Sequence, residues 1–389
     1  MAVYTKINKR DISLINKKFN IENFKNFKGI KQGIENTNYL LKSKNNKFIL
    51  TIFEKRVLKK EIPFFIKLMD QLSALNIICP KPLKNKNGQF LIKLKNKTAC
   101  IVSFLTGKSK KIRPLLTLLI AKMLKYNGTA HYNLAVCIEF IHNATLLHDD
   151  VIDDAIVRRG KEAANIIWGN KLSILIGDYL LSKSFKLMVK DKSIKVLEIL
   201  SETSLILARG QIQDANNISN ASLSEKEYLK LIFAKTAELF SVSCYLPAIL
   251  AKKNNKIQIQ LKNFGKNFGM AFQLSDDYLD YFGDSKKMGK NIGKDFYEGK
   301  ITYPLIHCFK SSSKINQNYL NKILSKKSRN NNDFVKVLKI MKLSNTKSES
   351  LKFMTKYLKK AQKNIKRFEG DSDKVYLDNL INYLLIRDH

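Results

Sequence analysis

Two patterns of hydrophobic residues divide the chain near residue 110. The segment before this point carries short apolar stretches with alternating or β-branched residues, separated by turn signals. The predicted strands are 38–41, 47–55 and 99–105, and the predicted hairpin turns are 45–47 and 84–89. One stretch, 61–75, repeats apolar residues at helical spacing instead. We therefore predict a small α+β module over 1–109.

From Pro114 onward the apolar residues recur with a period of 3.6, and hardly any strand signal interrupts them. The predicted helices are 114–126, 133–156, 171–189, 194–212, 225–250, 257–282, 334–341 and 350–368. Tracts near 251–257 and 311–333 are rich in Lys, Asn and Ser, so we expect surface loops there. The pattern predicts an all-α domain over 110–389.

The large net positive charge of the chain says little about which class of partner the protein binds. The 389 residues contain 70 Lys and Arg against 33 Asp and Glu, a formal net charge of +37, which favours anionic partners. The lysines are spread along the whole chain among Asn and Ile, as in a genome-wide residue bias. No zinc, helix-turn-helix or aromatic RNA-binding signature accompanies them, so we expect no nucleic-acid partner.

Cysteine usage and the absence of targeting signals indicate a compartment. Five cysteines are scattered without a CxxC pair, which argues against a disulfide framework or a zinc site. The start of the chain lacks the apolar region of a signal peptide, and no apolar run reaches the length of a membrane span. We expect a soluble, cytoplasmic protein. Its positive surface leaves peripheral contact with membranes open.

The most informative feature is an acidic cluster, "LLHDDVIDD", at 146–154. Four aspartates fall within six residues of a basic chain, directly after an apolar helical run. On a helix, Asp149 and Asp153 are four residues apart, so their carboxylates share one face and repel each other. A hard divalent cation neutralises such a pair well. The alternative for this cluster alone is a solvated acidic helix end.

A second cluster with the same DDxxD arrangement makes a metal site the better interpretation. "FQLSDDYLDYFGD" places Asp276, Asp277 and Asp280 at the end of another apolar helix. Two such clusters facing each other across a cavity favour Mg²⁺ completed by the phosphates of a diphosphate substrate. Basic residues follow both clusters, namely Arg158, Arg159, Lys290, Lys294 and Lys300. The arginine pair is suited to phosphate oxygens.

These motifs resemble those of the trans-polyprenyl diphosphate synthases. The similarity covers about 110–389 and rests on "KKIRPLL", "EFIHNATLLHDDVIDD", "RRGKEAAN", "GDYLLSKSF", "AKTAELF", "FQLSDDYLDYFGD" and "GKNIGKDFYEGKITYPLI". It implies an all-α isoprenoid-synthase bundle around a deep cavity, usually a homodimer. The substrates implied are isopentenyl diphosphate and an allylic diphosphate.

The resemblance also implies residue roles. Asp149, Asp153, Asp276 and Asp280 would hold Mg²⁺, and Asp150 and Asp277 complete the two catalytic clusters. Contacts to the allylic diphosphate are implied for Arg158, Lys235, Thr236, Gln273 and Lys290, and we count Lys300 as a further substrate-binding residue. Contacts to isopentenyl diphosphate are implied for Lys110, Arg113, His142 and Arg159. His148 also matches the sequence motif of the family, but we assign no role to it.

The implied chemistry needs no protein nucleophile. Departure of diphosphate leaves an allylic carbocation, the double bond of isopentenyl diphosphate attacks it, and a proton is lost. Ala144 and Thr145, five and four positions before Asp149, are small, and this favours a long product of the octaprenyl, quinone side-chain type. Gln211 and Asp214 instead resemble the short-chain branch of the family, so product length stays open.

Residues 1–109 resemble a different family. "FKGIKQGIENTNYLL", "KFILTIFEKR" and "CPKPLKNKNGQ" are similar to the N-terminal lobe of bacterial homoserine kinases of the aminoglycoside-phosphotransferase-like type. The resemblance implies a small sheet lobe that covers ATP in a complete kinase. The catalytic loop and metal-binding aspartate of the second lobe are missing, so we expect no homoserine kinase activity.

The two resemblances meet in "VSFLTGKSKKIRPLLTLL", 102–119. The synthase pattern has two glycines before Lys110, whereas this chain has Lys108 and Ser109. The first one or two helices of the synthase family are also missing. Three interpretations remain open: an active synthase with a vestigial lobe, a rearranged fusion with little activity, or a lobe recruited to bind nucleotides or proteins.

Overall fold

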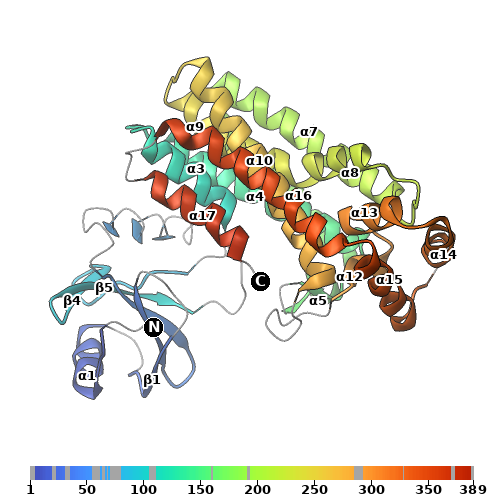
Figure 1. The fold of residues 1–389 in the computed structure, drawn as a ribbon. Coiled ribbons are helices and arrows are strands. Elements are labelled where there is room, and N and C mark those ends of the chain that lie inside the picture. The colour runs from blue at the N-terminus through green and yellow to red at the C-terminus, as the bar shows by residue number, and fades with distance from the viewer. Residues whose placement is uncertain are drawn as a thin grey trace. The chain divides into compact units, whose positions relative to one another are not determined.

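A computed structural model gives the fold of the chain (Figure 1). The residues that it describes are 5–19, 23–30, 36–54, 62–63, 66–67, 69–70, 80–104, 111–158, 161–190, 193–283, 292–326, 328–368 and 373–386. The chain forms two compact units, Met1–Lys108 and Ser109–His389.

The N-terminal unit contains a five-stranded antiparallel sheet in the order β1-β2-β3-β5-β4. It also contains α1 (Lys9–Lys18), a helix that the hydrophobic pattern did not predict. Its strands are β1 (Asn26–Gly29), β2 (Thr37–Lys42), β3 (Lys47–Ile52), β4 (Leu91–Leu94) and β5 (Lys97–Ser103). The three predicted strands are confirmed as β2, β3 and β5. Ile15 of α1 packs into one cluster with Leu41, Leu50 and Ile101 of the sheet, so the unit has its own core.

The two predicted turns have different outcomes. The β2–β3 hairpin closes where expected, with the Ser43 amide donating to the Asn46 carbonyl over 2.9 Å. The 84–89 turn exists, but it does not join two paired strands; the β4–β5 hairpin turns at Lys95 and Asn96 instead. Both of these residues have positive φ, which suits the twist of a two-residue hairpin. Of the predicted helix 61–75, the described residues 62–63, 66–67 and 69–70 are helical, and the rest lies outside the described residues.

The C-terminal unit is a helical bundle, and each predicted helix is present. Its long helices are α3 (Ile112–Met123), α4 (Ala130–Ile152), α6 (Asn170–Lys190), α7 (Ile194–Asn216), α8 (Glu225–Ile232), α9 (Glu238–Leu250), α10 (Asn255–Phe282), α15 (Asn331–Leu343), α16 (Thr346–Ile365) and α17 (Lys374–Ile386). A π-helical turn, η1 (Phe233–Ala237), joins α8 to α9 without a break. Shorter elements are α5 (Ala164–Trp168), α12 (Lys294–Glu298), α13 (Tyr303–Ser311) and η2 (Lys366–Phe368).

The loop predicted over 311–333 is wrong in part, because α14 (Lys314–Leu324) occupies its first half. Ser313 caps this helix, and Leu320, Ile323 and Leu324 bury one side of it. A small hairpin, β6 (Val157–Arg158) and β7 (Lys161–Glu162), was also not predicted. In both places the polar residues outnumber the apolar ones, so the few buried positions left no clear period.

Helix α10 runs through the middle of the bundle, beside α9 and α16 (Figure 1). Phe264 and Phe268 of α10 pack against Phe240 of α9 in the main core. At Gly265 a Cβ would lie 2.3 Å from the Phe240 carbonyl oxygen, so only glycine allows the two backbones to approach this closely. This contact fixes α10, which carries the second acidic cluster, against η1 and α9.

One helical stretch among the described residues, Glu225–Leu250, is long and apolar enough to cross a membrane by length and composition alone. The expectation that no run reaches this length is therefore wrong. The most apolar 18 residues of this stretch have a mean hydropathy of 1.2, and 72% of them are buried inside the bundle, as in the core helices of globular proteins.

Candidate active site

The first acidic cluster lies where α4 ends. Asp149 is in the last helical turn, and Asp153 is the residue that follows the helix, with its amide donating to the Asp149 carbonyl over 2.8 Å. The prediction that both lie inside one helix therefore needs correction, because the helix stops at Ile152. Asp150 points into the bundle, is 2% exposed and pairs with Arg158 of β6. This pair holds the β6–β7 hairpin beside the cluster.

Helices α7 and η1 place polar groups against Asp149. The Gln211 amide donates to Asp149 Oδ1 over 3.2 Å, and Lys235 Nζ lies 3.4 Å from the same carboxylate and 2.5 Å from Asp214. Burial raises the pKa of Asp149, and the charge of Lys235 offsets this only in part. Lys235 keeps a raised pKa in spite of burial, because Asp149 and Asp214 both favour its charged form.

Asp153 has a lysine partner of its own. Lys300 Nζ lies 2.9 Å from Asp153 Oδ2 and 2.9 Å from Glu298 Oε2. Burial acts to raise the pKa of Asp153, but the charge and hydrogen bond of Lys300 outweigh it and hold this pKa below its usual value. The two carboxylates predicted to repel each other are thus each neutralised by a lysine from another element.

The second cluster divides into two environments on α10. Asp277 is buried, accepting hydrogen bonds from the Tyr228 hydroxyl and, over 2.8 Å, from the Gln273 amide. Thr236 donates to Gln273 Oε1 over 2.7 Å, which links η1 to this network. Burial, and then the nearby charge of Asp295, raise the pKa of Asp277 well above its ordinary value. Asp277 therefore has its partners inside the protein.

Asp280 lies over the start of α12. Its two carboxylate oxygens accept the backbone amides of Lys294 and Asp295 over 3.1 Å and 3.0 Å. Burial, with the neighbouring charge of Asp295, raises the pKa of Asp280 to about 7. Burial also raises the pKa of Asp295 to about 6, while Lys300 opposes this rise. Because Lys300 acts on both Asp153 and Asp295, it connects the two clusters.

This donor set suits a metal ion that is completed by its substrate. Among the described residues, no three His, Cys, Asp or Glu side chains converge into a ready metal cage. Mg²⁺ is commonly held by one or two carboxylates together with substrate phosphates, so an all-protein cage is not required. Asp149, Asp153 and Asp280 are the carboxylates whose partners are lysines, an amide side chain or backbone amides. The side chains here fit the predicted metal.

A separate group of bases lies at the start of α3. An Arg113 guanidinium nitrogen is 3.2 Å from His142 Nε2, and the guanidinium stacks over the Phe240 ring at 4.2 Å from its centroid. Lys111 pairs with the buried Glu139 one turn before His142. The structure therefore brings together Arg113 and His142, two residues assigned to isopentenyl diphosphate. Lys110, Arg159 and Lys290 lie outside the described residues.

The residues proposed to set product length lie on α4 before Asp149. Ala144 is 2% exposed, and Thr145 is partly buried with its hydroxyl donating to the His142 carbonyl over 2.8 Å. The Thr145 carbonyl in turn accepts from Gln211 over 3.2 Å. Both positions are occupied by small side chains at the packed wall between α4 and α7.

Comparison with known proteins places this geometry in a family. Residues 95–341 match the model of the polyprenyl synthetase family, which is well over half of the chain. The chain belongs to the polyprenyl synthetase family. It is a prenyltransferase with the helical isoprenoid-synthase fold, and its family acts on prenyl diphosphates.

Individual relatives agree with this assignment. The chain is 38% identical to the octaprenyl diphosphate synthase of Escherichia coli (strain K12) over 240 residues, 61% of this chain and 74% of that protein. A decaprenyl diphosphate synthase from Rhodobacter capsulatus superposes with a TM-score of 0.69 and 34% identity, covering 72% of this chain and 87% of that one. A polyprenyl synthase from Caulobacter crescentus CB15, solved with calcium and isoprenyl diphosphate, gives 0.68 and 35%, covering 72% and 86%.

The N-terminal unit matches a second family. Residues 26–115 fit the model of the phosphotransferase enzyme family, and the five-stranded sheet is consistent with the N-terminal lobe of a kinase. The two family matches overlap over 95–115. This overlap contains the basic stretch in which the two sequence patterns meet.

Several residues of the site were missed by the sequence reasoning. Tyr228 and Asp295 shape the second cluster, and Glu139 and Lys111 support the bases on α3. Asp295 lies in the quoted motif "GKNIGKDF", so its acidic character beside a lysine was a usable signal. Tyr228 gave none, because it is one of several aromatic residues at core spacing.

Proposed function

We propose that the protein condenses isopentenyl diphosphate with an allylic diphosphate, in a Mg²⁺-dependent reaction, to make a long trans-polyprenyl diphosphate of the quinone side-chain type. The observation that carries the proposal is that two lysines lie against the first DDxxD cluster, Lys235 at Asp149 and Lys300 at Asp153. The Lys300 amide also donates to the carbonyl of Asp295, whose own amide donates to Asp280 of the second cluster. Carboxylates hold each lysine in place, so both positive charges lie where the diphosphate leaving group would depart.

The side chains suggest a division of tasks. Lys235 and Lys300 exchange their carboxylate partners for oxygens of the allylic diphosphate, and their charges stabilise it as it departs. Mg²⁺, when bound by the aspartates, supplies Lewis-acid stabilisation of the same leaving group. Arg113 and His142 hold the diphosphate of the second substrate, and the buried wall near Ala144 keeps water from the carbocation. Attack leaves a positive charge on the isopentenyl unit, and loss of a proton from its C2 carbon forms the new double bond; this proton passes to the released diphosphate.

Two features support a long product. Ala144 and Thr145 are small side chains on α4, five and four positions before Asp149. The relatives described above include octaprenyl and decaprenyl synthases. Gln211, which resembles the short-chain branch, lies against Thr145 and Asp149 instead of projecting as a bulky stop.

A homodimer in the cytoplasm is part of the proposal. Helices α5 to α7 expose large apolar side chains, including Ile167, Trp168, Leu175 and Tyr179, each at least half exposed. Large exposed apolar side chains on neighbouring helices of a soluble enzyme favour burial against a second copy. The N-terminal unit adds only the first lobe of a kinase, so homoserine phosphorylation is not expected.

The test uses the full-length chain with farnesyl diphosphate, isopentenyl diphosphate and Mg²⁺, and measures chain-extended product. We expect polyprenyl diphosphate from the wild type and at least a hundredfold loss with Asp149→Asn. Asp154→Asn is the matched control, because Asp154 is exposed in the same cluster and its positive φ of 45° suits asparagine.

Two results would contradict the proposal. Soluble, folded wild-type protein that makes no product would favour the rearranged fusion with little activity. Equal losses with the Asp149 and Asp154 variants would mean that the acidic cluster does not act through the predicted residue.

A further inference from the structure

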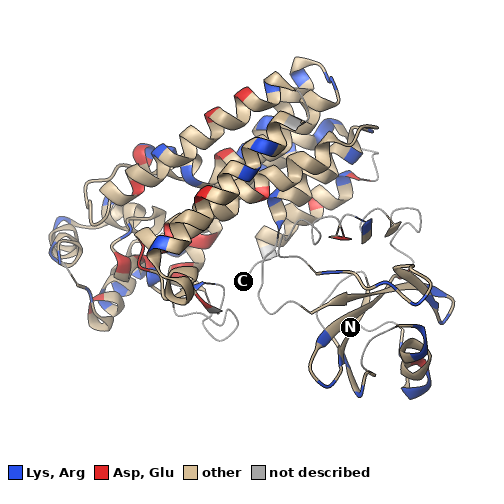
Figure 2. Cartoon of the chain, turned by 180° about the vertical axis from the view of Figure 1, so that it is seen from behind, with Lys and Arg blue, Asp and Glu red and all other residues tan. Residues whose placement is uncertain are grey.

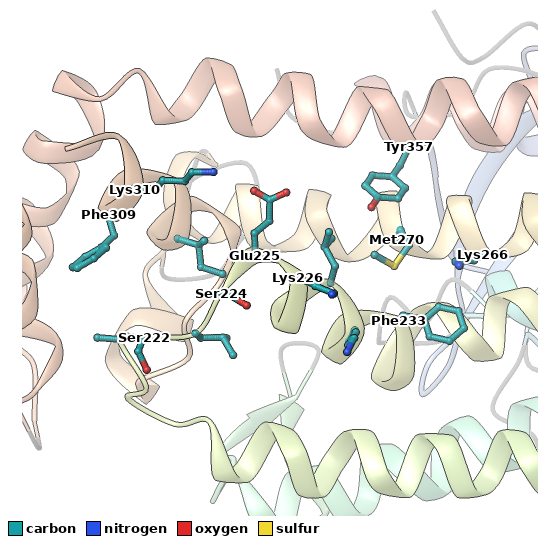
Figure 3. A pocket seen from close by; sticks show the side chains of 15 residues that line it. Ser222, Ser224, Glu225, Lys226, Phe233, Lys266, Met270, Phe309, Lys310 and Tyr357 are labelled. Atoms are coloured by element: carbon teal, nitrogen blue, oxygen red, sulfur yellow. The ribbon is translucent and has the colours of Figure 1, made fainter.

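A second concave site lies on another part of the helical unit. A groove of about 830 Å³ runs between α8, α10, α13 and α16. Figure 3 shows Tyr357 pointing from α16 toward Met270 on α10, with Lys226 of α8 and Phe233 of η1 also lining the groove. A volume of this size is typical of small-molecule sites.

The groove has an apolar floor. The residues that form it come from all four helices and are Leu229, Phe233, Met270, Ile306, Phe309 and Tyr357. Met270 and Ile306 are buried, while the others remain partly accessible. Partly exposed aliphatic and aromatic side chains in a concavity favour an apolar chain over water.

Four lysines border this floor. Lys226, Lys230, Lys266 and Lys310 all line the groove against a single carboxylate, Glu225, which gives a lining charge of +3. Lys226 and Lys230 are four residues apart on α8, a spacing at which like charges repel. Among the described residues, none of the four lysines forms an ion pair, and all four are exposed. Lys266 Nζ instead lies 4.9 Å from the centroid of the Phe233 ring.

The groove is separate from the acidic clusters although the two sites share one helix. Phe233, the first residue of η1, lines the groove, whereas Lys235 two residues later contacts Asp149 and Asp214. Of the residues described as lining the groove, none is among the described hydrogen-bond partners of the seven aspartates of the two acidic clusters. A ligand of the groove would therefore not compete directly for those carboxylates.

We propose that this groove binds an anionic amphiphile, with its apolar chain over Leu229, Phe233 and Met270 and its phosphate head group among Lys226, Lys230 and Lys266. The lining matches both halves of such a molecule, because the floor excludes a purely ionic ligand and the lysines disfavour a neutral one. The proposal adds a binding site beyond the prenyl-transfer reaction and does not require that reaction.

Calorimetry with monomeric oleoyl lysophosphatidic acid tests the site in the full-length protein. We expect one binding event whose Kd rises at least tenfold in Lys226→Gln/Lys230→Gln. Oleoyl lysophosphatidylcholine, with the same chain and no net charge, and glycerol 3-phosphate, with the head and no chain, should each bind at least tenfold more weakly.

The control is Lys42→Gln/Lys47→Gln, which makes the same change of charge at exposed positions of the N-terminal sheet. Circular dichroism and retained polyprenyl synthesis establish that both double variants are folded. Equal weakening by both double variants, equal binding of the neutral lipid, or no binding of the anionic one would overturn the proposal.

Two further arms identify the source of the amphiphile. The first arm measures binding of farnesyl diphosphate in EDTA. If this binding is lost in Lys226→Gln/Lys230→Gln but kept in Asp149→Asn, the natural ligand is a soluble prenyl diphosphate. The second arm measures sedimentation of the protein with phosphatidylglycerol vesicles. If sedimentation depends on the same two lysines and farnesyl diphosphate does not bind, the natural ligand is a membrane lipid. Capture by either probe that is insensitive to the two lysines counts against the groove.

Discussion

At the scale of single residues, two aspartates of the second cluster, Asp277 and Asp280, have different surroundings. Asp280 accepts backbone amides at the start of α12, whereas Asp277 is enclosed by Tyr228 and Gln273. Gln273 also accepts a hydrogen bond from the hydroxyl of Thr236, a residue to which the family resemblance assigns contact with the allylic substrate. Asp277 is therefore linked by hydrogen bonds to Tyr228 and, through Gln273, to Thr236.

Removing the Tyr228 hydroxyl tests this connection. Tyr228→Phe leaves Asp277 Oδ2 buried without its hydroxyl donor, so we expect the free energy of unfolding to fall by about 1–3 kcal/mol. Urea denaturation measures the change. Tyr297→Phe is the control, because that hydroxyl is on an exposed residue and makes only a 3.5 Å contact with Asn331. Equal destabilisation by the two variants would contradict the role given to Tyr228.

The raised pKa of Asp280 predicts a pH dependence of stability without metal. A carboxyl with a folded-state pKa of about 7 keeps its proton more readily in the folded than in the unfolded protein. Its contribution therefore favours folding at low pH and is lost as pH rises from about 4 to about 7. Relative to wild type, Asp280→Asn should gain thermal stability between pH 5 and pH 8 in EDTA.

The metal should interact with the same carboxyl. Since protons and Mg²⁺ compete for Asp280, added Mg²⁺ should stabilise the wild type more at pH 8 than at pH 6, and this difference should shrink in Asp280→Asn. A pH-independent difference between the two proteins in EDTA would show that Asp280 has an ordinary pKa.

Sequence reasoning located the acidic residues but not their partners. Asp149, Asp153 and Asp280 stand out because acidic clusters are rare in this basic chain. Tyr228 lies 49 positions before Asp277, and Lys300 lies 147 positions after Asp153. Helical periodicity shows which face of a helix is buried, but it does not show which residue of another helix meets it.

At the scale of elements, the π-helical turn η1 between α8 and α9 determines which side chains face the acidic residues. A π turn adds one residue to a helical turn, and such turns are frequent at functional sites. Here it contains Lys235, which contacts Asp149 of the first acidic cluster, and Thr236, which donates to Gln273, itself a hydrogen-bond donor to Asp277 of the second. Gly210 of α7 allows the close approach, because a Cβ there would lie 2.9 Å from the Cβ of Ala234 and 3.1 Å from the Lys235 nitrogen.

Gly210→Ala should separate α7 from η1. Alanine normally stabilises a helix interior relative to glycine, so a loss of stability would identify the contact as the cause. We expect a fall of about 1–3 kcal/mol in the free energy of unfolding. The KM for the allylic substrate should also rise, because Gln211 and Asp214 follow Gly210 on the same helix.

Ser204→Ala provides a control on α7, where it removes only a hydrogen bond to the Leu200 carbonyl. Chemical denaturation and steady-state kinetics measure both variants. An unchanged or more stable Gly210→Ala protein would show that the two elements move apart at no cost.

The long helices were predictable from their apolar period, and the exceptions have physical reasons. α14 buries three residues within a polar segment, and η1 differs from an α-helix by one hydrogen-bond step that leaves the hydrophobic pattern almost unchanged. The β4–β5 turn uses Lys95 and Asn96 in place of the glycine that marks most such turns. These elements depend on tertiary packing that no local pattern records.

At the scale of the whole molecule, the chain combines two units with separate cores. The sheet buries its own cluster around Leu41, Leu50 and Ile101, and the bundle is centred on α10. The family matches overlap over 95–115, so β5 and the start of α3 belong to both patterns. Separate cores predict that the helical unit does not need the sheet to fold.

Deleting residues 1–108 tests this independence. We expect the remaining chain to be soluble, to unfold within a few degrees of the helical transition of the full protein, and to make polyprenyl product. Calorimetry and the product assay measure these properties, and the full-length protein should show no thermal shift with millimolar ATP. An insoluble or inactive helical unit would show that the sheet has a structural role, and a shift with ATP would support a nucleotide-binding lobe.

Charge is distributed differently outside and inside the molecule. Figure 2 shows Lys and Arg scattered over both units, in agreement with the spread along the sequence. In the reaction site, Lys235 and Lys300 are each surrounded by two carboxylates. In the proposed reaction, the basic exterior would attract diphosphates over distances at which salt screens the interaction, whereas the partly buried lysines would change partners over a few ångströms, where screening is weak. Ionic strength thus governs how often substrate arrives and leaves the later exchange of charge within the site largely untouched.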